Sequence, residues 1–125
     1  MSRAEVLARS RRKTDRIDAV LLGDTEVQWS LVDDCSPEVR MQVAFSGTDA
    51  MRAVLIEDED FRVRSAVAWT GTDAMRSILM SDPVVAVRVH VARHGTDEQR
   101  DFLANDESVH VRLEVEKHRN KDVKS

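Results

Sequence analysis

The stretch VRSAVAWTGTDAMRSILMSD, Val63–Asp82, contains the hexapeptide GTDAMR, which also occurs at Gly47–Arg52. The two copies lie 24 residues apart, and a shift of the whole chain by 24 aligns far more than these six residues without a gap. A fixed period of this length indicates stacked units, because a single unit of 24 residues cannot bury its own apolar face.

The repeat is visible as columns of identical residues. Val precedes Arg, a second Val follows four positions after the first, Leu stands three before a closing Asp, and Gly opens the middle turn. The columns are Arg16, Arg40, Arg64, Arg88 and Arg112; Val39, Val63, Val87 and Val111; Val43, Val67, Val91 and Val115; Leu31, Leu55, Leu79 and Leu103; Asp34, Asp58, Asp82 and Asp106; and Gly23, Gly47, Gly71 and Gly95. The units therefore run 11–34, 35–58, 59–82 and 83–106, with a half unit from 107.

Each unit is predicted to contain two short helices around a Gly-Thr turn. Val63 and Val67 are spaced i, i+4, as are Met75 and Leu79, which places each pair on one helix face. An alternative is a strand–helix unit, because 85–92 and 109–116 alternate apolar and polar residues. The sister segments VRMQVAF and VRSAVAW keep the valine spacing and lose the alternation, which favours helix. A 3₁₀ conformation is a further alternative for such short pieces.

The turns carry helix-capping residues. Gly47, Gly71 and Gly95 suit a left-handed position at the end of the first helix. Thr at 25, 48, 72 and 96 is expected to cap the second helix, with capping boxes for Thr25 with Gln28 and Thr96 with Gln99. Ser36-Pro37 and Asp82-Pro83 are expected to supply the cap and first residue of first helices.

Composition fits one domain, 1–125. The chain is 42% apolar but only 4% aromatic, has Cys35 as its sole cysteine, and has no apolar run of the length that spans a membrane. We expect a cytoplasmic protein with a basic N-terminal cap (1–14), a repeat region (15–116) and a basic, flexible tail (117–125). The net charge of −4 combines basic ends with a body, 14–116, of −11.

The recurring pattern D..VR..VA...GTD..R..L..D resembles the variant leucine-rich repeat, a relative of HEAT-type repeats. The residues that carry the resemblance are Val63-Arg64, Val67-Ala68, Thr72, Leu79 and Asp82, with their equivalents one period away. The resemblance covers roughly 15–116 and implies a right-handed superhelix of alternating α- and 3₁₀-helices. A known member carries an iron–sulfur cluster on a separate cysteine motif, which this chain lacks, so no cofactor is expected. The predicted fold is all-α, a short right-handed α-solenoid of about four and a half units.

The arginine column Arg40, Arg64, Arg88 and Arg112 has two interpretations. It could be a row of anion-binding groups along a groove. Each Arg also lies six residues after a column Asp, so Arg–Asp pairs could link the units. Because the residue recurs in every unit, we favour the structural interpretation.

The candidate partner-binding residues lie at a repeat position where the residue type changes from unit to unit. The fourth position of the Val-Ala stretch reads Leu21, Phe45, Trp69 and Arg93, and this mixture predicts an exposed edge with the composition of an interaction hot spot. The alternative is that Phe45 and Trp69 cover seams between units. A further column of Arg52, Arg76 and Arg100 is expected on a solvated face of the second helices, with Arg52 and Arg76 near the partner. Trp29 and Phe61 are interpreted as packing residues.

The histidines and the cysteine give little support for a metal site or a catalytic site. His90 and His94 are spaced i, i+4, as in metal sites on helices, but they lack further ligands and are interpreted as surface residues. Cys35 has no evident base and is expected to be an inert packing residue. We predict no catalytic residue and no metal site.

The first hypothesis is therefore a non-enzymatic module that binds another protein, of basic or mixed charge, as a stoichiometric inhibitor or an adaptor. The alternatives are a nucleic-acid-binding protein that uses the arginine column, or an acidic mimic that blocks a DNA- or RNA-binding protein. The acidic body argues against the nucleic-acid-binding alternative, since it repels phosphate.

Overall fold

The computed structural model describes residues 1–123 of the chain, and the side chains of residues 1–119. This part of the chain forms α-helices and no strand, which confirms the all-α prediction. The two stretches with alternating polarity, 85–92 and 109–116, both lie in α-helices. The segments after the Gly-Thr turns are α-helices as well, seven residues long from the second unit onward, rather than 3₁₀-helices.

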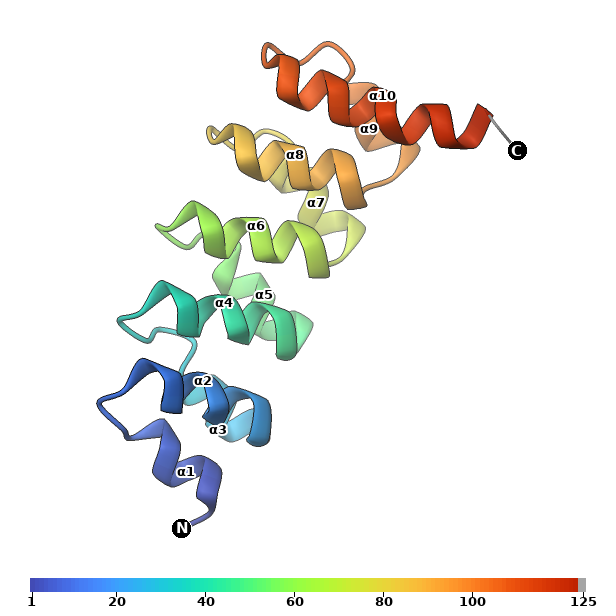
Figure 1. Ribbon diagram of the computed structural model, residues 1–125. Coiled ribbons are helices and arrows are strands. Elements are labelled where there is room, and N and C mark those ends of the chain that lie inside the picture. The colour runs from blue at the N-terminus through green and yellow to red at the C-terminus, as the bar shows by residue number, and fades with distance from the viewer. Residues whose placement is uncertain (124–125) are drawn as a thin grey trace.

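The helices form two layers (Figure 1). The first layer contains the longer helices α2 (Lys13–Leu22), α4 (Pro37–Ser46), α6 (Phe61–Thr70), α8 (Val85–His94) and α10 (Val109–Val123), each packed against the next. The second layer contains α3 (Thr25–Ser30), α5 (Asp49–Leu55), α7 (Asp73–Leu79) and α9 (Asp97–Leu103). In Figure 1 the second-layer helices lie behind the first, and α1 (Arg3–Ala8) packs beside α2 at the N-terminal end.

The core lies between the two layers. The column valines of α4, α6 and α8 have no solvent exposure, and Met51, Leu55, Leu79 and Leu103 of the second layer are equally enclosed. Val85 and Val89 are partly buried against this core as well. The apolar stripe of α8 is therefore wide, and this width explains why its sequence alternates like a strand.

A continuous ladder of arginine and aspartate connects the units. Arg40 donates from Nε and Nη2 to the carboxylate of Asp58, 18 residues later, at 2.8 and 3.1 Å, and from Nη1 to the backbone carbonyl of Asp34 at 2.6 Å. Arg64 and Arg88 repeat this geometry with Asp82 and Asp106. Bidentate pairs of this kind combine charge with fixed orientation.

Each column aspartate also begins the next first-layer helix. The carboxylate of Asp58 accepts a hydrogen bond from the backbone N–H of Asp60 at 2.9 Å, and Asp34, Asp82 and Asp106 accept the equivalent bond from the residue two positions ahead. One carboxylate therefore orients the turn of its own unit and binds the arginine of the unit before.

The turn glycines correct an expectation. Gly47, Gly71 and Gly95 have negative φ, between −80° and −87°, so none adopts the left-handed conformation. Glycine is needed for space instead. A Cβ at Gly71 would lie 2.7 Å from the carbonyl oxygen of Val67 and 2.7 Å from Sδ of Met75.

Two predicted caps differ in detail. Thr25 is the first residue of α3 rather than its cap, and Asp24 accepts the capping bond from the Val27 N–H. Helix α8 begins at Val85, so Asp82-Pro83 precedes its cap residue, Val84. Thr48, Thr72 and Thr96 cap their helices as predicted, and Thr96 forms the predicted capping box with Gln99.

The ends of the chain are helical over most of their described length. Ala4 of α1 is buried, and α1 packs against α2 of the first unit. Helix α10 continues through Val123, so residues 117–123 of the predicted flexible tail are helical, and 124–125 lie outside the described residues. Among the described helices, none has both the length and the apolar character required to cross a bilayer.

The ladder predicts a large loss of stability for Asp58→Ala. This substitution leaves the guanidinium of Arg40, only 9% exposed, without its carboxylate, and the loss of one partner of a buried ion pair costs about 3 to 5 kcal/mol. Urea unfolding followed by circular dichroism measures the change. Glu57→Ala is the matched control, because the Glu57 side chain is adjacent and exposed; equal effects of the two would contradict the structural role of the ladder.

We expect Gly71→Asn to destabilise the protein at least as much as Gly71→Ala. Both substitutions add a Cβ that would lie only 2.7 Å from the carbonyl oxygen of Val67. A left-handed glycine would instead tolerate Asn better than Ala. Thermal unfolding of the two variants distinguishes these explanations, and a clearly more stable Asn variant would contradict the steric one.

Candidate functional site

The residues that break the fourth-position column lie on the outer face of the first layer. Phe45 on α4 is 37% exposed and Trp69 on α6 is 50% exposed. Arg93 on α8 is also exposed and donates from Nε to Glu114 at 2.8 Å. The structure therefore brings all three onto one surface that crosses α4, α6 and α8.

Trp69 is the centre of an aromatic cluster. Phe45 meets it edge-on, with ring centroids 5.5 Å apart and planes at 86°. On its other side, the rings of His90 and His94 are nearly parallel to the indole, at 5.8 and 5.2 Å. These contacts orient the Trp69 side chain while half of its surface stays open to solvent.

Beside this cluster lies a small apolar groove, which we call the aromatic groove. Its volume is about 190 Å³. It is lined by Met41 and Phe45 of α4, Phe61, Arg62, Ser65, Ala66 and Trp69 of α6, and Ala86 and His90 of α8. Serine and alanine at 65 and 66 leave room that larger side chains would fill, and the three aromatic residues form the walls.

Two of the residues that line the groove each contain a buried polar side-chain atom without a partner. Ser65 is only 8% exposed, and its Oγ makes no hydrogen bond within the described residues. Nδ1 of His90 is likewise buried and unbonded in that part of the chain. Each such group costs about 1–3 kcal/mol when it is left unsatisfied, so natural proteins rarely retain them without a reason.

The histidines of the cluster favour the neutral form. Burial lowers the pKa of His90 below its ordinary value, the Arg93 charge lowers this pKa further, and Glu114 opposes the shift. Burial also lowers the pKa of His94, with smaller contributions from His90 and the neighbouring cations. A neutral imidazole can either donate or accept a hydrogen bond at Nδ1, depending on its tautomer.

Arg52 and Arg76 lie elsewhere and are not solvated, which corrects the sequence interpretation. Their side chains are 13% and 12% exposed. Arg52 donates to the carbonyl of Ala44 at the end of α4 and to Asp49 in its own helix, and Arg76 makes the equivalent bonds to Ala68 and Asp73. Arg100 repeats the pattern. These arginines satisfy carbonyls at the C-terminal ends of first-layer helices and so connect the two helices of each unit.

The ladder arginines are also engaged. The guanidinium groups of Arg40, Arg64 and Arg88 are each bound to a carboxylate and to a carbonyl, with side chains 7–14% exposed. Arg112 donates to the carbonyl of Asp106. The geometry is that of links between units, and it leaves little of the three paired guanidinium groups for an external anion.

The acidic charge is segregated from the groove. The segments that contain the second-layer helices and turns, 23–36, 47–60, 71–84 and 95–108, hold sixteen acidic and three basic residues. The first-layer helices from 13 to 94 hold three acidic and seven basic ones. The face with the aromatic groove is therefore not the acidic face of the molecule.

Sequence reasoning missed several residues of this surface. Phe61, interpreted as a packing residue, is 42% exposed and lines the groove. Trp29, which was given the same interpretation, is 41% exposed but lies on the second layer. Ser65 interrupts the apolar column of Ile17, Met41 and Val89, and this interruption was a readable signal. On the opposite layer, Val54, Ile78 and Phe102 form a second exposed apolar row at the 24-residue period.

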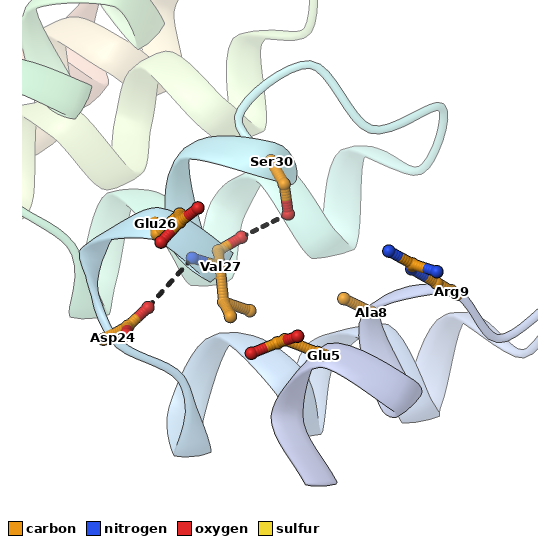
Figure 2. A pocket seen from close by; sticks show the side chains of 7 residues that line it. All are labelled: Glu5, Ala8, Arg9, Asp24, Glu26, Val27 and Ser30. Atoms are coloured by element: carbon orange, nitrogen blue, oxygen red, sulfur yellow. Dashed lines mark hydrogen bonds between the residues drawn. The ribbon is translucent and has the colours of Figure 1, made fainter. Parts of the chain in front are cut away.

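Figure 2 shows a larger but more polar cleft between α1 and α3, with a volume of about 350 Å³. Two of its polar side chains serve local structure, since Asp24 caps α3 and Ser30 donates to the carbonyl of Val27. Cys35 is exposed, so its interpretation as a packing residue is wrong, and Arg16 lies 3.7 Å from its Sγ. Across the described residues, no three His, Cys, Asp or Glu side chains lie close enough to share a metal ion.

No protein-family model matches the chain, and neither a curated protein nor a solved structure matches it significantly. The function of the groove is therefore argued from its own residues.

Because the pKa values of His90 and His94 are lowered, we expect the protein to lose stability in mild acid. The unfolded chain takes up a proton on each ring near pH 6.5, whereas the folded protein does so only at lower pH. The contribution of these histidines to the free energy of unfolding is therefore most favourable above pH 6.5, and it decreases as the pH falls through that value. Urea unfolding at pH 7.5 and 5.5 should show a smaller pH effect in a His90→Gln, His94→Gln double variant than in the unmodified protein.

His110→Gln is the control for this experiment, because His110 is exposed on α10, away from the cluster. Its pH dependence should match that of the unmodified protein. The same pH dependence in the double variant would contradict the assignment.

Proposed function

We propose that the protein is a short right-handed α-solenoid, similar to variant leucine-rich repeats, that binds another protein through the aromatic groove and catalyses no reaction. The observation that carries this proposal is Trp69, half exposed yet oriented by Phe45 and two histidines. Exposed tryptophan, fixed by its neighbours beside a small pocket, is typical of the hot spots of protein interfaces.

The size of the groove supports a side-chain anchor rather than a metabolite. Sites for drug-sized molecules usually have volumes of roughly 300–1,000 Å³, and this groove has about 190 Å³. Its Ser and His do not form a nucleophile–base pair, because Ser65 Oγ makes no hydrogen bond with any described residue. A partner that inserts one apolar side chain fits these properties best.

The charges at the rim favour a partner of mixed charge. Arg62 is paired with Asp60 at 2.9 Å and lies 3.6 Å from Glu38, and Arg93 is paired with Glu114. The exposed arginines on this part of the surface are therefore each paired with a carboxylate. With this arrangement the protein would act by occupying the partner's surface, as an inhibitor or an adaptor does.

The nucleic-acid alternative has less support. Phosphate binding needs accessible cations, and the ladder arginines Arg40, Arg64 and Arg88 are occupied by aspartate. An acidic mimic would use the second layer instead, where the negative charge is concentrated. The lysate experiment below distinguishes nucleic-acid binding and acidic mimicry from protein binding at the groove.

Trp69→Ala should abolish partner capture. The immobilised protein is exposed to nuclease-treated cell lysate, and retained proteins are identified by mass spectrometry. Proteins retained by the unmodified chain should be lost with Trp69→Ala, because the central contact of the groove is removed. Trp29→Ala is the matched control, since Trp29 is similarly exposed but lies on the second layer, and it should retain the same proteins.

Circular dichroism of each variant verifies that the helices are intact. Equal retention by the Trp69 and Trp29 variants would contradict a partner site at the groove. Capture that disappears on nuclease treatment would favour nucleic acid, and a captured nucleic-acid-binding protein lost only with second-layer acidic substitutions would favour the mimic.

A further inference from the structure

The outer face of the second layer carries a row of exposed apolar side chains, one from each of three consecutive units. Val54 on α5, Ile78 on α7 and Phe102 on α9 occupy equivalent repeat positions, and each residue is more than half exposed. Single exposed apolar residues are ordinary, but a row that recurs at the repeat period forms a continuous stripe. No part of the described chain covers this stripe.

A groove beside the row, between α7 and α9, brings carboxylates next to apolar side chains. Its volume is about 490 Å³, and its lining includes Asp73 and Met80 from the third unit and Glu98 and Phe102 from the fourth. Both carboxylate residues are exposed. The buried side chain of Gln99 connects the two helices, because its Nε2 donates to the backbone carbonyl of Asp73 at 2.7 Å.

The fourth unit departs from the repeat at this groove. The sequence GTDAMR of the second and third units becomes GTDEQR at Gly95–Arg100. Asp101-Phe102 follows where the earlier units have Ala53-Val54 and Ser77-Ile78. The fourth unit therefore adds two carboxylates and an aromatic ring at exposed positions, and the other units show that the repeat framework does not require them.

The charge of this face determines which partner fits. The second-layer segments hold sixteen acidic residues, and their three basic residues, Arg52, Arg76 and Arg100, are bound to backbone carbonyls of the protein itself. The face therefore attracts a positively charged segment and repels phosphate and acidic segments. A lysine or arginine fits the groove in particular, because its aliphatic stem covers apolar surface such as Phe102 while its charged end reaches a carboxylate.

The spacing of the row favours a helical segment. Consecutive first-layer helices pack against one another, and packed helices lie about 8–10 Å apart. In an α-helix, residues seven apart lie on one face and about 10.5 Å apart along the axis. A helix that lies along the stack therefore places one apolar residue on each unit. Side chains on one side of an extended segment are about 6.6 Å apart, which does not match the units.

We propose that the outer face of the second layer binds a basic amphipathic helix of a partner protein. Apolar residues of that helix, seven apart, lie on Val54, Ile78 and Phe102, and its lysine and arginine side chains bind exposed carboxylates such as Asp73 and Glu98. This surface is on the layer opposite to the aromatic groove, so the inference goes beyond the proposed function and does not depend on it.

A synthetic peptide tests the proposal. The probe is a fluorescein-labelled, helix-forming peptide with three leucines spaced seven residues apart, lysines on both sides of the leucine stripe, and alanine elsewhere. Fluorescence anisotropy measures its binding to the full chain at physiological ionic strength. A peptide of the same composition with shuffled leucine positions should bind at least tenfold more weakly, because it lacks the apolar stripe. Equal affinities of the two peptides would show attraction by charge alone and would overturn the docking of a helix along the row.

The variants assign the binding to this face. Ile78→Ser with Phe102→Ser should weaken binding at least tenfold, because it removes two of the three apolar contacts. Asp73→Asn with Glu98→Gln should weaken binding several-fold and reduce its dependence on salt concentration. Trp69→Ala is the matched control, since Trp69 is a similarly exposed aromatic residue on the opposite layer, and it should leave the affinity unchanged. Circular dichroism verifies that each variant is folded.

The outcomes distinguish this surface from the aromatic groove. If Trp69→Ala weakens peptide binding and the Ile78, Phe102 double variant does not, the helix binds at the groove and the inference is wrong. If the peptide with the leucine stripe does not bind the unmodified chain, the inference is overturned as well. Neither result decides the proposed function, which depends on the lysate comparison of the Trp69 and Trp29 variants.

Discussion

The arginine–aspartate ladder is the interaction on which the rest of the structure depends. Each arginine binds the carbonyl of one column aspartate and the carboxylate of the next, so Asp34, Arg40, Asp58, Arg64 and their successors form one continuous chain of hydrogen bonds. The same carboxylates orient the turns that start the first-layer helices. The valine core supplies most of the apolar burial, but valines alone would permit neighbouring units to slide or rotate. Bidentate pairs fix the spacing and the orientation of each unit.

The aromatic groove exists because this regular frame tolerates variation on its outer face. Core positions repeat valine, and ladder positions repeat arginine. The outer face of the first layer instead carries Phe45, Trp69 and Arg93 at one column and Met41, Ser65 and Val89 at another. Large rings on adjacent helices form walls, and Ser65 leaves the space between them. Binding surfaces often arise in this way, where a rigid scaffold presents side chains that its own stability does not require.

Much of the fold could be predicted from the sequence, because the repeat places Val63 and Val67 on one face and the valine spacing outweighs the alternation in 85–92. The glycine turns were assigned for the wrong reason, since sequence shows that Gly71 is required but not whether by φ or by space. Arg52 was predicted to be solvated because an arginine exposed on a helix face and one bound to a carbonyl have the same sequence signal. Trp69 was found through its broken column, whereas Phe61 was not, because the depth of its side chain depends on the packing of α4 against α6.

The ladder has a consequence for the evolution of the molecule. Every rung has the same geometry and connects only adjacent units, so the duplication or loss of a complete 24-residue unit would leave every remaining rung with a partner. An insertion of any other length would bring Arg88 out of register with Asp106. Chain length is therefore free to change in whole units beyond α8, while α4, α6 and α8, and the groove across them, keep their mutual arrangement. Proteins of different lengths built from this unit could then share one groove.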